Sequence, residues 1–276
     1  MIIDGRAIAD AILTNLHNEV EKLSIKPKLA VILMWESPAS LSYIKQKERS
    51  AKVADIDFEL RQISINATEW EILHIIHELN KDSEIHGIIV QLPLPKHIDV
   101  NTIIEAIDPR KDVDGFTSQN IGKLFLGIAD LVSCTPKGIM RLLETKDIKV
   151  RGENIVVIGK SNIVGKPLSL LLMNAGGTVT VCSKDTRNLS EFTKNADIIV
   201  IAAGSPNLLK KNMVRSGATI IDVGFTLVDG KIRGDADFDA LEPTCLMTPV
   251  PGGVGPMTVA MLMENTYLAM KNQVIH

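Results

Sequence analysis

The sequence of 276 residues predicts an α/β fold with two domains. Short apolar runs of strand length alternate with segments of helical periodicity, and this alternation favours parallel βαβ units with helices on both faces of a sheet. The alternation occurs once before Gly115 and again after Ser133, so we place a domain boundary between these two residues. Hydrophobic residues make up 45% of the chain, which is enough for two modest cores.

The first half of the chain predicts three helices and three strands. Apolar residues recur at helical spacing from Ile8 to Leu23, which indicates an amphipathic N-terminal helix. The run KLAVILM is continuous and apolar, as expected for a strand that is buried on both faces. We expect strands over 28–34, 57–63 and 86–92, and the other two helices over 37–54 and 68–79.

The second half repeats this rhythm. Thr135 can cap a helix whose first residue is Pro136. Four strand candidates follow, and helical segments separate at least the first three. We expect the last helix, over 257–270, to fold back onto the first domain. The four strands are expected over 155–158, 179–182, 198–202 and 219–223.

Composition and charge exclude several classes of protein. The formal net charge of −3 argues against a nucleic-acid partner, because proteins that bind nucleic acid are usually basic. No apolar stretch approaches the roughly 18 residues of a membrane span, and the first ten residues do not resemble a signal peptide. Three scattered cysteines fit buried thiols in the reducing cytoplasm better than disulfides, and His74 and His77 lack a third metal ligand. The cysteines are Cys134, Cys182 and Cys245.

The segment NIVVIGKSNIVGKPLSLLL, residues 154–172, has the outline of a phosphate-binding turn. Such a site needs a strand that ends in a tight turn, free backbone N–H groups and a helix that starts at the phosphates. Gly159 can make the turn, Gly165 permits close packing of the helix, and Ser161 offers a hydroxyl in place of a second glycine. The segment predicts a Rossmann-type dinucleotide-binding domain, and an ordinary strand–turn–helix connection is the alternative.

Charges near this turn bear on the choice of dinucleotide. Lys160 lies in the loop and Lys184 just after the second strand, and positive charge there favours the 2′-phosphate of NADP. Asp185 is adjacent and could instead accept a hydrogen bond from the free 2′-hydroxyl of NAD. We therefore expect NADP, with NAD the less favoured choice. The alternative is that all three are solvated surface charges.

Tyr43 and Lys47 are four residues apart on a predicted helix, so they share a face. A phenol beside an amine can handle protons or stack on a flat ring. A neutral catalytic lysine needs its pKa drawn from about 10.4 towards 7–8, roughly 4 kcal/mol, and only a sheltered pocket supplies that. The alternative is a packing role for Tyr43 and a solvated Lys47.

Three further features support a ligand site. Gln91 closes a strand at its carboxyl end, where open α/β sheets bind their ligands. Asp112 and Asp114 lie on a predicted turn, where an Asp-Gly pair is also ordinary turn chemistry. The run TPVPGGVGPMT, residues 248–258, is the densest in glycine and proline, and its Pro256 fits the first position of the last helix.

Seven segments in this order resemble one known family along almost the whole chain. They are PASLSYIKQK, GIIVQLPLP, DPRKDVDGF, CTPKG, VVIGKSNIVGKP, VGF and PVPGGVGPMT. The family is the bifunctional methylenetetrahydrofolate dehydrogenase/methenyltetrahydrofolate cyclohydrolase, of the bacterial and archaeal FolD type. The resemblance implies a three-layer α/β domain that binds folate and carries catalysis (1–118 with 256–276), a Rossmann-type NAD(P)-binding domain (119–255), and a cleft between them.

The resemblance also implies roles for individual residues. The catalytic residues would be Lys47, Tyr43, Gln91 and Asp114. The substrate would contact Tyr43, Gln91, Asp114, Pro251, Gly252 and Gly253. The dinucleotide would contact Gly159, Lys160, Ser161, Ile163, Val164, Gly165, Ser183, Lys184, Ala203, Gly204, Gly224 and Thr258.

The sequence departs from the family pattern at three places. Lys160 replaces the usual arginine, which keeps the charge but loses the bidentate fork for phosphate. The segment CSKDT, residues 182–186, stands where the family has C-H-S-x-T, so the histidine is missing, which puts the contacts to the adenosine side in doubt. Trp35 stands where the family usually has glycine and could narrow the mouth of the cleft.

The activity implied by the resemblance has two steps. 5,10-Methylenetetrahydrofolate gives a hydride to NADP⁺, and water then attacks the methenyl cation to give 10-formyltetrahydrofolate. Tyr43 would stack on the substrate, Asp114 would hold the pterin, and Lys47, tuned by Gln91, would activate water. The resemblance further implies a cytoplasmic homodimer in one-carbon metabolism that serves purine biosynthesis, with no metal.

Other functions remain open at this point. A family member with only the dehydrogenase activity would keep the same motifs. A short-chain dehydrogenase also uses a Tyr-x-x-x-Lys pair, but there the glycine loop precedes the pair, whereas here Lys47 precedes Gly159. A dinucleotide-binding sensor without catalysis would leave the set of Tyr43, Lys47, Gln91 and Asp114 unexplained.

Overall fold

The computed structural model describes residues 1–34 and 38–274, so Trp35 lies outside the described residues. The chain forms two compact units. The three-stranded unit comprises Ala11–Cys134 and Val259–His276, and the five-stranded unit comprises Met1–Asp10 and Thr135–Thr258. The expected two-unit α/β organisation is confirmed. The functional boundaries at 118/119 and 255/256 stay a prediction.

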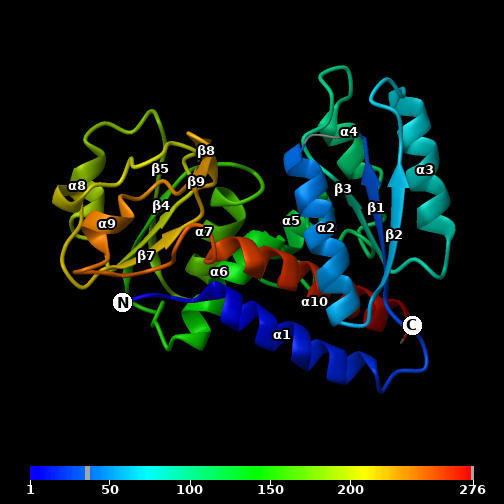
Figure 1. Ribbon diagram of the computed structural model, residues 1–276, viewed down its shortest axis with the longest axis horizontal. Coiled ribbons are helices and arrows are strands. Elements are labelled where there is room, and N and C mark those ends of the chain that lie inside the picture. The colour runs from blue at the N-terminus through cyan, green and yellow to red at the C-terminus, as the bar shows by residue number, and fades with distance from the viewer. Residues whose placement is uncertain (35–37, 275–276) are drawn as a thin grey trace. The chain divides into compact units, whose positions relative to one another are not determined.

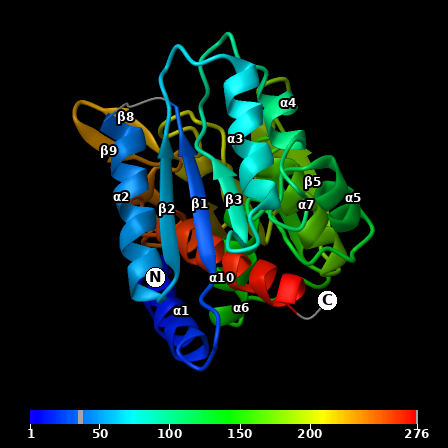
Figure 2. The same ribbon diagram turned by 90° about the vertical axis from the view of Figure 1, so that its right-hand side faces the viewer.

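The three-stranded unit is built on a parallel sheet with the strand order β2-β1-β3, which Figure 2 shows side by side. Helix α2 connects β1 to β2, and α3 connects β2 to β3, on opposite sides of these strands (Figure 1). This is the three-layer arrangement expected from the alternation. The elements are β1 (Lys28–Leu33), α2 (Pro38–Val53), β2 (Asp57–Gln62), α3 (Glu69–Lys81) and β3 (Gly87–Val90).

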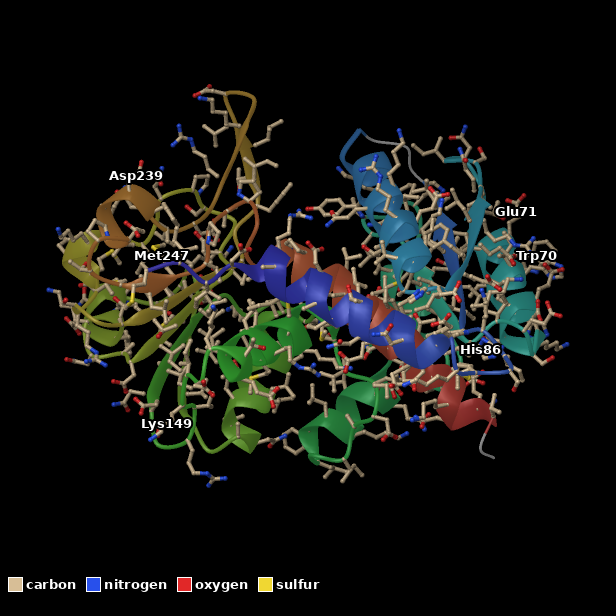
Figure 3. All side chains as sticks on the ribbon, turned by 60° about the horizontal axis from the view of Figure 1, so that its bottom comes forward. Trp70, Glu71, His86, Lys149, Asp239 and Met247 are labelled. Atoms are coloured by element: carbon tan, nitrogen blue, oxygen red, sulfur yellow. The ribbon has the colours of Figure 1, made fainter. Side chains whose placement is uncertain are left out.

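The core of this unit lies between the sheet and α3. Ile32 and Ile88 of the sheet pack with Ile72 and Ile76 of α3, and all four side chains are fully buried. The opposite face of α3 carries Trp70, which is 70% exposed and is labelled in Figure 3. Burial on one face only explains why the apolar pattern of this helix could be recognised. The remaining helices that reach this unit are α1 (Gly5–Val20), α4 (Val100–Glu105), α5 (Ser118–Phe125) and α10 (Val254–Val274).

The five-stranded unit has a parallel sheet in the order β10-β7-β6-β4-β5. Strand β4 lies between β5 and β6, so the chain turns to opposite sides after β4, and this point is where open α/β sheets bind ligands. All four strands expected in the second half are present, whereas β10, two residues long, was not predicted because it is too short for a periodic pattern. The strands are β4 (Asn154–Ile158), β5 (Thr178–Cys182), β6 (Ile198–Ile201), β7 (Thr219–Asp222) and β10 (Leu246–Met247, labelled at Met247 in Figure 3).

Short helices and a hairpin connect these strands. The antiparallel hairpin of β8 and β9 follows β7 and was not predicted. Figure 1 shows α7 and α8 within this unit, near the strands that they connect. The helices are α6 (Cys134–Thr145), α7 (Gly165–Asn174), α8 (Leu189–Thr193), η1 (Lys211–Met213) and α9 (Phe238–Leu241), and the hairpin strands are β8 (Thr226–Val228) and β9 (Lys231–Arg233).

Two helix starts differ from the sequence prediction. Helix α6 begins at Cys134, so Thr135 lies in its first turn instead of capping it, and Thr135 Oγ1 hydrogen-bonds Thr258 Oγ1 at 2.9 Å. Helix α10 begins at Val254, so Pro256 is its third residue and not its first. A proline is tolerated at either place, because the first N–H groups of a helix have no partner within it.

The last helix returns to the first part of the chain, as expected. Asn265 Nδ2 donates to the carbonyl oxygens of Val113 and Val132, both at 2.8 Å. These bonds tie α10 to loops that lie more than 130 residues away in sequence. Across residues 1–34 and 38–274, no helix combines the length and the apolar character needed to cross a membrane.

Candidate active site

A lysine–glutamine pair joins α2 to the end of β3. Lys47 Nζ donates to Gln91 Oε1 at 2.8 Å, and Gln91 Nε2 donates to the carbonyl oxygen of Leu92 at 2.7 Å. The backbone N–H of Gln91 still bonds Ile32 of the sheet at 2.9 Å. The glutamine is therefore held by its backbone and by both ends of its amide, so it can orient the lysine. The sequence placed Lys47 and Gln91 in one site, and the structure brings them together.

Asp114 lies on a turn that is anchored by Asp112. The Asp112 carboxylate is buried and accepts hydrogen bonds from the N–H groups of Phe116 and Thr117, from Thr117 Oγ1 and from Asn120 Nδ2, at 2.7 to 3.2 Å. A carboxylate with this many donors fixes the turn on which Asp114 lies. The sequence offered Asp112 and Asp114 together on a predicted turn, and the family resemblance implied a role for Asp114 alone; the anchoring role of Asp112 was not predicted.

Burial shifts the pKa of three groups in this region. Burial lowers the pKa of the Lys47 amine, and the negative charge of Asp114 opposes this shift. Burial raises the pKa of Asp114, which the charge of Lys47 opposes and that of Asp112 reinforces. The phenol of Tyr43 also has its pKa raised by burial, so it stays protonated. Each shift favours the neutral form, as expected of a lysine that exchanges protons in a sheltered site.

A small pocket adjoins Asp114 within the three-stranded unit. Asp112, Asp114 and Phe116 contribute to its lining. The rest of the wall is apolar, and it consists of Ile88, Ile89, Val90, Leu92, Ile104 and Ile107. Its free space is about the size of one water molecule, so this pocket is too small to be the ligand site itself.

The glycine turn after β4 is formed by close backbone packing. Gly159 has a φ of +130°, and a Cβ there would lie 2.4 Å from the carbonyl oxygen of Ala202. A Cβ on Gly165 would lie 2.0 Å from the carbonyl oxygen of Gly159. Ser161 Oγ accepts from the N–H of Val164 at 3.2 Å at the start of α7 and keeps its hydrogen for another acceptor. The tight turn and the exposed loop before a helix fit a dinucleotide phosphate.

Lys160 and Asp185 form an ion pair at the carboxyl edge of β4 and β5. Lys160 Nζ lies 3.0 Å from Asp185 Oδ2, and both side chains are exposed. The sequence placed both residues near the ribose without predicting that they pair. Lys184 is exposed in the same turn, and the N–H of Ser183 donates to Thr186 Oγ1 at 2.8 Å.

Two buried carboxylates, those of Asp222 and Asp235, lie near the ends of β6 and β7. The sequence analysis did not predict them. Asp235 Oδ2 accepts from the N–H groups of Ala203 and Gly204 at 2.7 and 2.8 Å. Asp222 accepts from three backbone N–H groups, including that of Asp235 at 3.0 Å, and burial raises its pKa to about 6. A Cβ on Gly224 would lie 2.4 Å from the nitrogen of Asp235, so this glycine is already required by packing within the protein.

The glycine–proline run before α10 packs on the first residues of the chain. The carbonyl oxygen of Gly252 accepts from the N–H of Arg6 at 2.9 Å, and Gly252 has a φ of +110°. A Cβ on Gly253 would lie 2.6 Å from the side chain of Thr248. Internal packing thus accounts for both glycines, and contact of Pro251 with a ligand stays a prediction.

His74 of α3 makes local contacts. The ring of His74 stacks on Trp70 with 5.4 Å between the ring centres, and its Nε2 lies 3.4 Å from Glu78. Among the residues that the structure describes, no group of three or more His, Cys, Asp or Glu side chains is placed to hold a metal ion.

The fold and these residues define a class of protein: a two-unit α/β protein that combines a dinucleotide-binding sheet with a partly buried lysine site. Models of two domains match the chain. The tetrahydrofolate dehydrogenase/cyclohydrolase catalytic domain matches residues 3–114, and the NAD(P)-binding domain of the same name matches residues 133–274. The chain therefore belongs to the tetrahydrofolate dehydrogenase/cyclohydrolase family.

Whole-chain relatives agree with this assignment. The bifunctional protein FolD of Campylobacter concisus is 50% identical over 278 residues, which cover 99% of this chain and 98% of the relative. The crystal structure of the bifunctional enzyme FolD from Campylobacter jejuni has a TM-score of 0.97 at 44% identity and covers 99% of both chains. FolD of Trypanosoma brucei, solved with NADP and an inhibitor, has a TM-score of 0.95 at 34% identity and covers 100% of this chain and 99% of that one.

Proposed function

We propose that this chain oxidises 5,10-methylenetetrahydrofolate to the methenyl form with NADP⁺ and hydrolyses the methenyl form to 10-formyltetrahydrofolate. The observation that carries the proposal is the bond from Lys47 Nζ to Gln91 Oε1 at 2.8 Å, in a region where burial lowers the pKa of the lysine. This pair lies in the part of the chain that matches the catalytic domain of the family. The glycine turn lies in the part that matches the NAD(P)-binding domain.

Lys47 acts on water in the hydrolytic step. Water adds to the methenyl carbon, the bond from this carbon to N5 breaks as N5 takes up one proton of the water, and the other proton is released. The neutral amine of Lys47 takes that proton from the attacking water, because burial already disfavours its charged form. The positive charge of the methenyl substrate disfavours the ammonium form further. Gln91 accepts from Lys47 and keeps the amine aimed at one place.

Asp114 and Tyr43 bind the substrate. Asp114 lies on the turn that Asp112 anchors and offers its carboxyl group for hydrogen bonds to the pterin. Tyr43 stays protonated, and its ring can stack on the flat substrate. Pro251, Gly252 and Gly253 complete the proposed substrate contacts.

The dinucleotide, when bound, supplies the hydride acceptor. The close packing at Gly159 and Gly165 places the start of α7 and the Ser161 hydroxyl beside the carboxyl end of β4, where we propose that the pyrophosphate binds. The remaining contacts proposed for the dinucleotide are Lys160, Ile163, Val164, Ser183, Lys184, Ala203, Gly204, Gly224 and Thr258.

The proposal is tested by following each step separately in a Lys47→Met variant. We expect hydrolysis, measured by the loss of methenyl absorbance, to fall by about 10³-fold, because the proton acceptor is removed. Lys45→Met is the matched control, since Lys45 is exposed on the same helix, and it should hydrolyse normally.

Three outcomes are informative in this test. Hydrolysis retained in a folded Lys47→Met protein would refute the role of the lysine. Oxidation without hydrolysis in the wild-type protein would indicate a dehydrogenase-only enzyme. Tight NADP⁺ binding with no rise in reduced-cofactor absorbance would indicate a sensor.

The proposal extends to the setting of the enzyme. Cys134, Cys182 and Cys245 are buried and outside any disulfide, which fits a reducing cytoplasm, where the 10-formyl product could supply purine biosynthesis. Resemblance to the family further supports a homodimer. Light scattering at several protein concentrations tests the assembly, and a single monomeric mass throughout would contradict it.

A further inference from the structure

We propose that Asp185 is a specificity-determining residue whose pairing with Lys160 lets the adenosine-ribose site accept both the 2′-hydroxyl of NAD⁺ and the 2′-phosphate of NADP⁺. The proposal rests on the proposed dinucleotide-dependent oxidation. It adds that this chain discriminates only weakly between the two dinucleotides, and it names the residue responsible.

Strand register places the two residues together. Strands β4 and β5 are parallel neighbours, with Ile158 opposite Cys182 at their carboxyl ends. Lys160 follows β4 by two residues and Asp185 follows β5 by three. Both loops therefore leave the same edge of the sheet, which explains the distance of 3.0 Å from Lys160 Nζ to Asp185 Oδ2. In dinucleotide folds, the end of the second strand meets the adenosine ribose.

Hydrogen bonds in the turn after β5 hold Asp185 at this edge. Its backbone N–H donates to Ser183 Oγ at 3.2 Å, and Ser183 Oγ lies 3.4 Å from Asp185 Oδ2. The N–H of Ser183 in turn donates to Thr186 Oγ1 at 2.8 Å. The carboxylate is thus presented from a closed turn, although its side chain is 64% exposed.

The two charges of the pair favour different dinucleotides. With NAD⁺ bound, Asp185 can accept a hydrogen bond from the 2′-hydroxyl and keep its contact with Lys160, since a carboxylate has two oxygens. With NADP⁺ bound, Lys160 must turn to the 2′-phosphate, while the carboxylate repels that phosphate. The exposed pair is weak enough to open, so either ligand can bind.

The nature of the cation also limits selectivity for phosphate. Lysine is a single point charge and lacks the bidentate fork with which arginine grips phosphate. Lys184, exposed beside Asp185, supplies a second positive charge that maintains some affinity for NADP⁺. Lys166, the second residue of α7, instead donates to Asn162 Oδ1 at 2.7 Å in the loop before this helix.

The experiment compares kcat/KM for NADP⁺ and NAD⁺ in three variants. We expect Asp185→Asn to raise the NADP⁺/NAD⁺ ratio by about tenfold, and Lys160→Gln to lower it by about tenfold, which is the range of one charged hydrogen bond. Asp239→Asn, an exposed acid on α9 labelled in Figure 3, is the matched control and should leave the ratio unchanged. A ratio that stays within about twofold of wild type in Asp185→Asn overturns the proposal.

Binding of fragments separates this proposal from the proposed function. Calorimetry with adenosine 2′,5′-bisphosphate and with AMP reports the 2′-phosphate preference without any turnover. Asp185→Asn should increase the affinity for the bisphosphate relative to the affinity for AMP. If no oxidation occurs with either dinucleotide but the fragment preference shifts in this way, the proposed function fails and the role of Asp185 stands. An equal change in affinity for both fragments would show that Asp185 does not determine the preference.

Discussion

Two lysines, each with an aspartate nearby, occupy contrasting surroundings in this protein. Lys47 is partly buried, bonds a fixed glutamine, and has its pKa lowered by burial against the opposing charge of Asp114. Lys160 pairs with Asp185 in the open, with 58% of its side chain exposed. In the first case burial makes proton transfer accessible to the lysine. In the second, water screens the charges, so the pair can act in recognition of a ligand but contributes little to stability.

The largest expected difference is in unfolding free energy, between variants of the residues that hold Asp114 and Asp185 in place. Asp112→Ala removes a buried acceptor of four hydrogen bonds and leaves their donors without partners. We expect this variant to lose about 4 kcal/mol of unfolding free energy. Ser183→Ala, the matched change beside Asp185, should lose less than about 1 kcal/mol, because its hydroxyl is only partly buried. Urea unfolding measures both, and equal losses would show that the two anchors do not differ.

Asp222 is a buried acid in the five-stranded unit, the same unit that carries the exposed pair of Lys160 and Asp185. It therefore tests whether burial shifts a pKa in this unit as it does around Lys47. Its pKa is about 6 in the folded protein against 3.8 unfolded. As pH rises from 3.8 towards 6, the unfolded chain releases this proton first, so the unfolding free energy falls, by about 3 kcal/mol in total. Below 3.8 and above 6 this contribution is constant.

The Asp222→Asn variant isolates that contribution. Acids whose pKa is lowered in the fold, such as Glu59 and Asp108, change stability in the opposite direction and are present in both proteins. The asparagine loses the bond from Ala236 at every pH, so that cost does not depend on pH. The difference in unfolding free energy, wild type minus variant, should fall between pH 4 and pH 6. A flat or rising difference would contradict the burial argument.

The next effect concerns the charge that opposes burial at Lys47. Asp114 raises the pKa of Lys47, so Asp114→Asn should lower it further and extend hydrolysis to lower pH. We expect the acid limb of the pH profile of kcat to move to lower pH. Asp185→Asn is the control and should leave this limb in place. The position of the limb, and not the rate, is the measurement, because Asp114 also binds the substrate in the proposed function.

Local patterns in the sequence were sufficient to predict the site around Lys47. They were insufficient to predict the pairing of Lys160 with Asp185. Tyr43 and Lys47 share a helix face at a spacing of four, and Gln91 ends a buried strand, so each could be recognised from its own element. The pairing of Lys160 with Asp185 depends on the register of β4 against β5, which no local pattern encodes. Register is set by which side chains the packed sheet buries, so it is a property of the assembled sheet and not of either strand alone.

The buried acids of the five-stranded unit were missed for a related reason. Asp222 ends β7, and Asp235 follows a hairpin, so thirteen residues separate them. Nothing in the intervening sequence indicates that the hairpin returns Asp235 to the strand end. The packing becomes visible only through Gly224 and Gly234, since a Cβ on Gly234 would lie 2.1 Å from Asp222 Oδ2. Both glycines look like ordinary turn residues in the sequence.

The smallest expected effect is on the stability of the exposed pair itself. Lys160→Gln removes the ion pair with Asp185 while keeping a long polar side chain. Because water already solvates both charges, we expect the unfolding free energy to change by less than about 0.5 kcal/mol. Urea unfolding at low and at high salt measures this, and the two salt conditions should differ little between variant and wild type. A loss above about 1.5 kcal/mol would mean that the pair stabilises the fold, and its role would then resemble that of the buried anchor at Asp112.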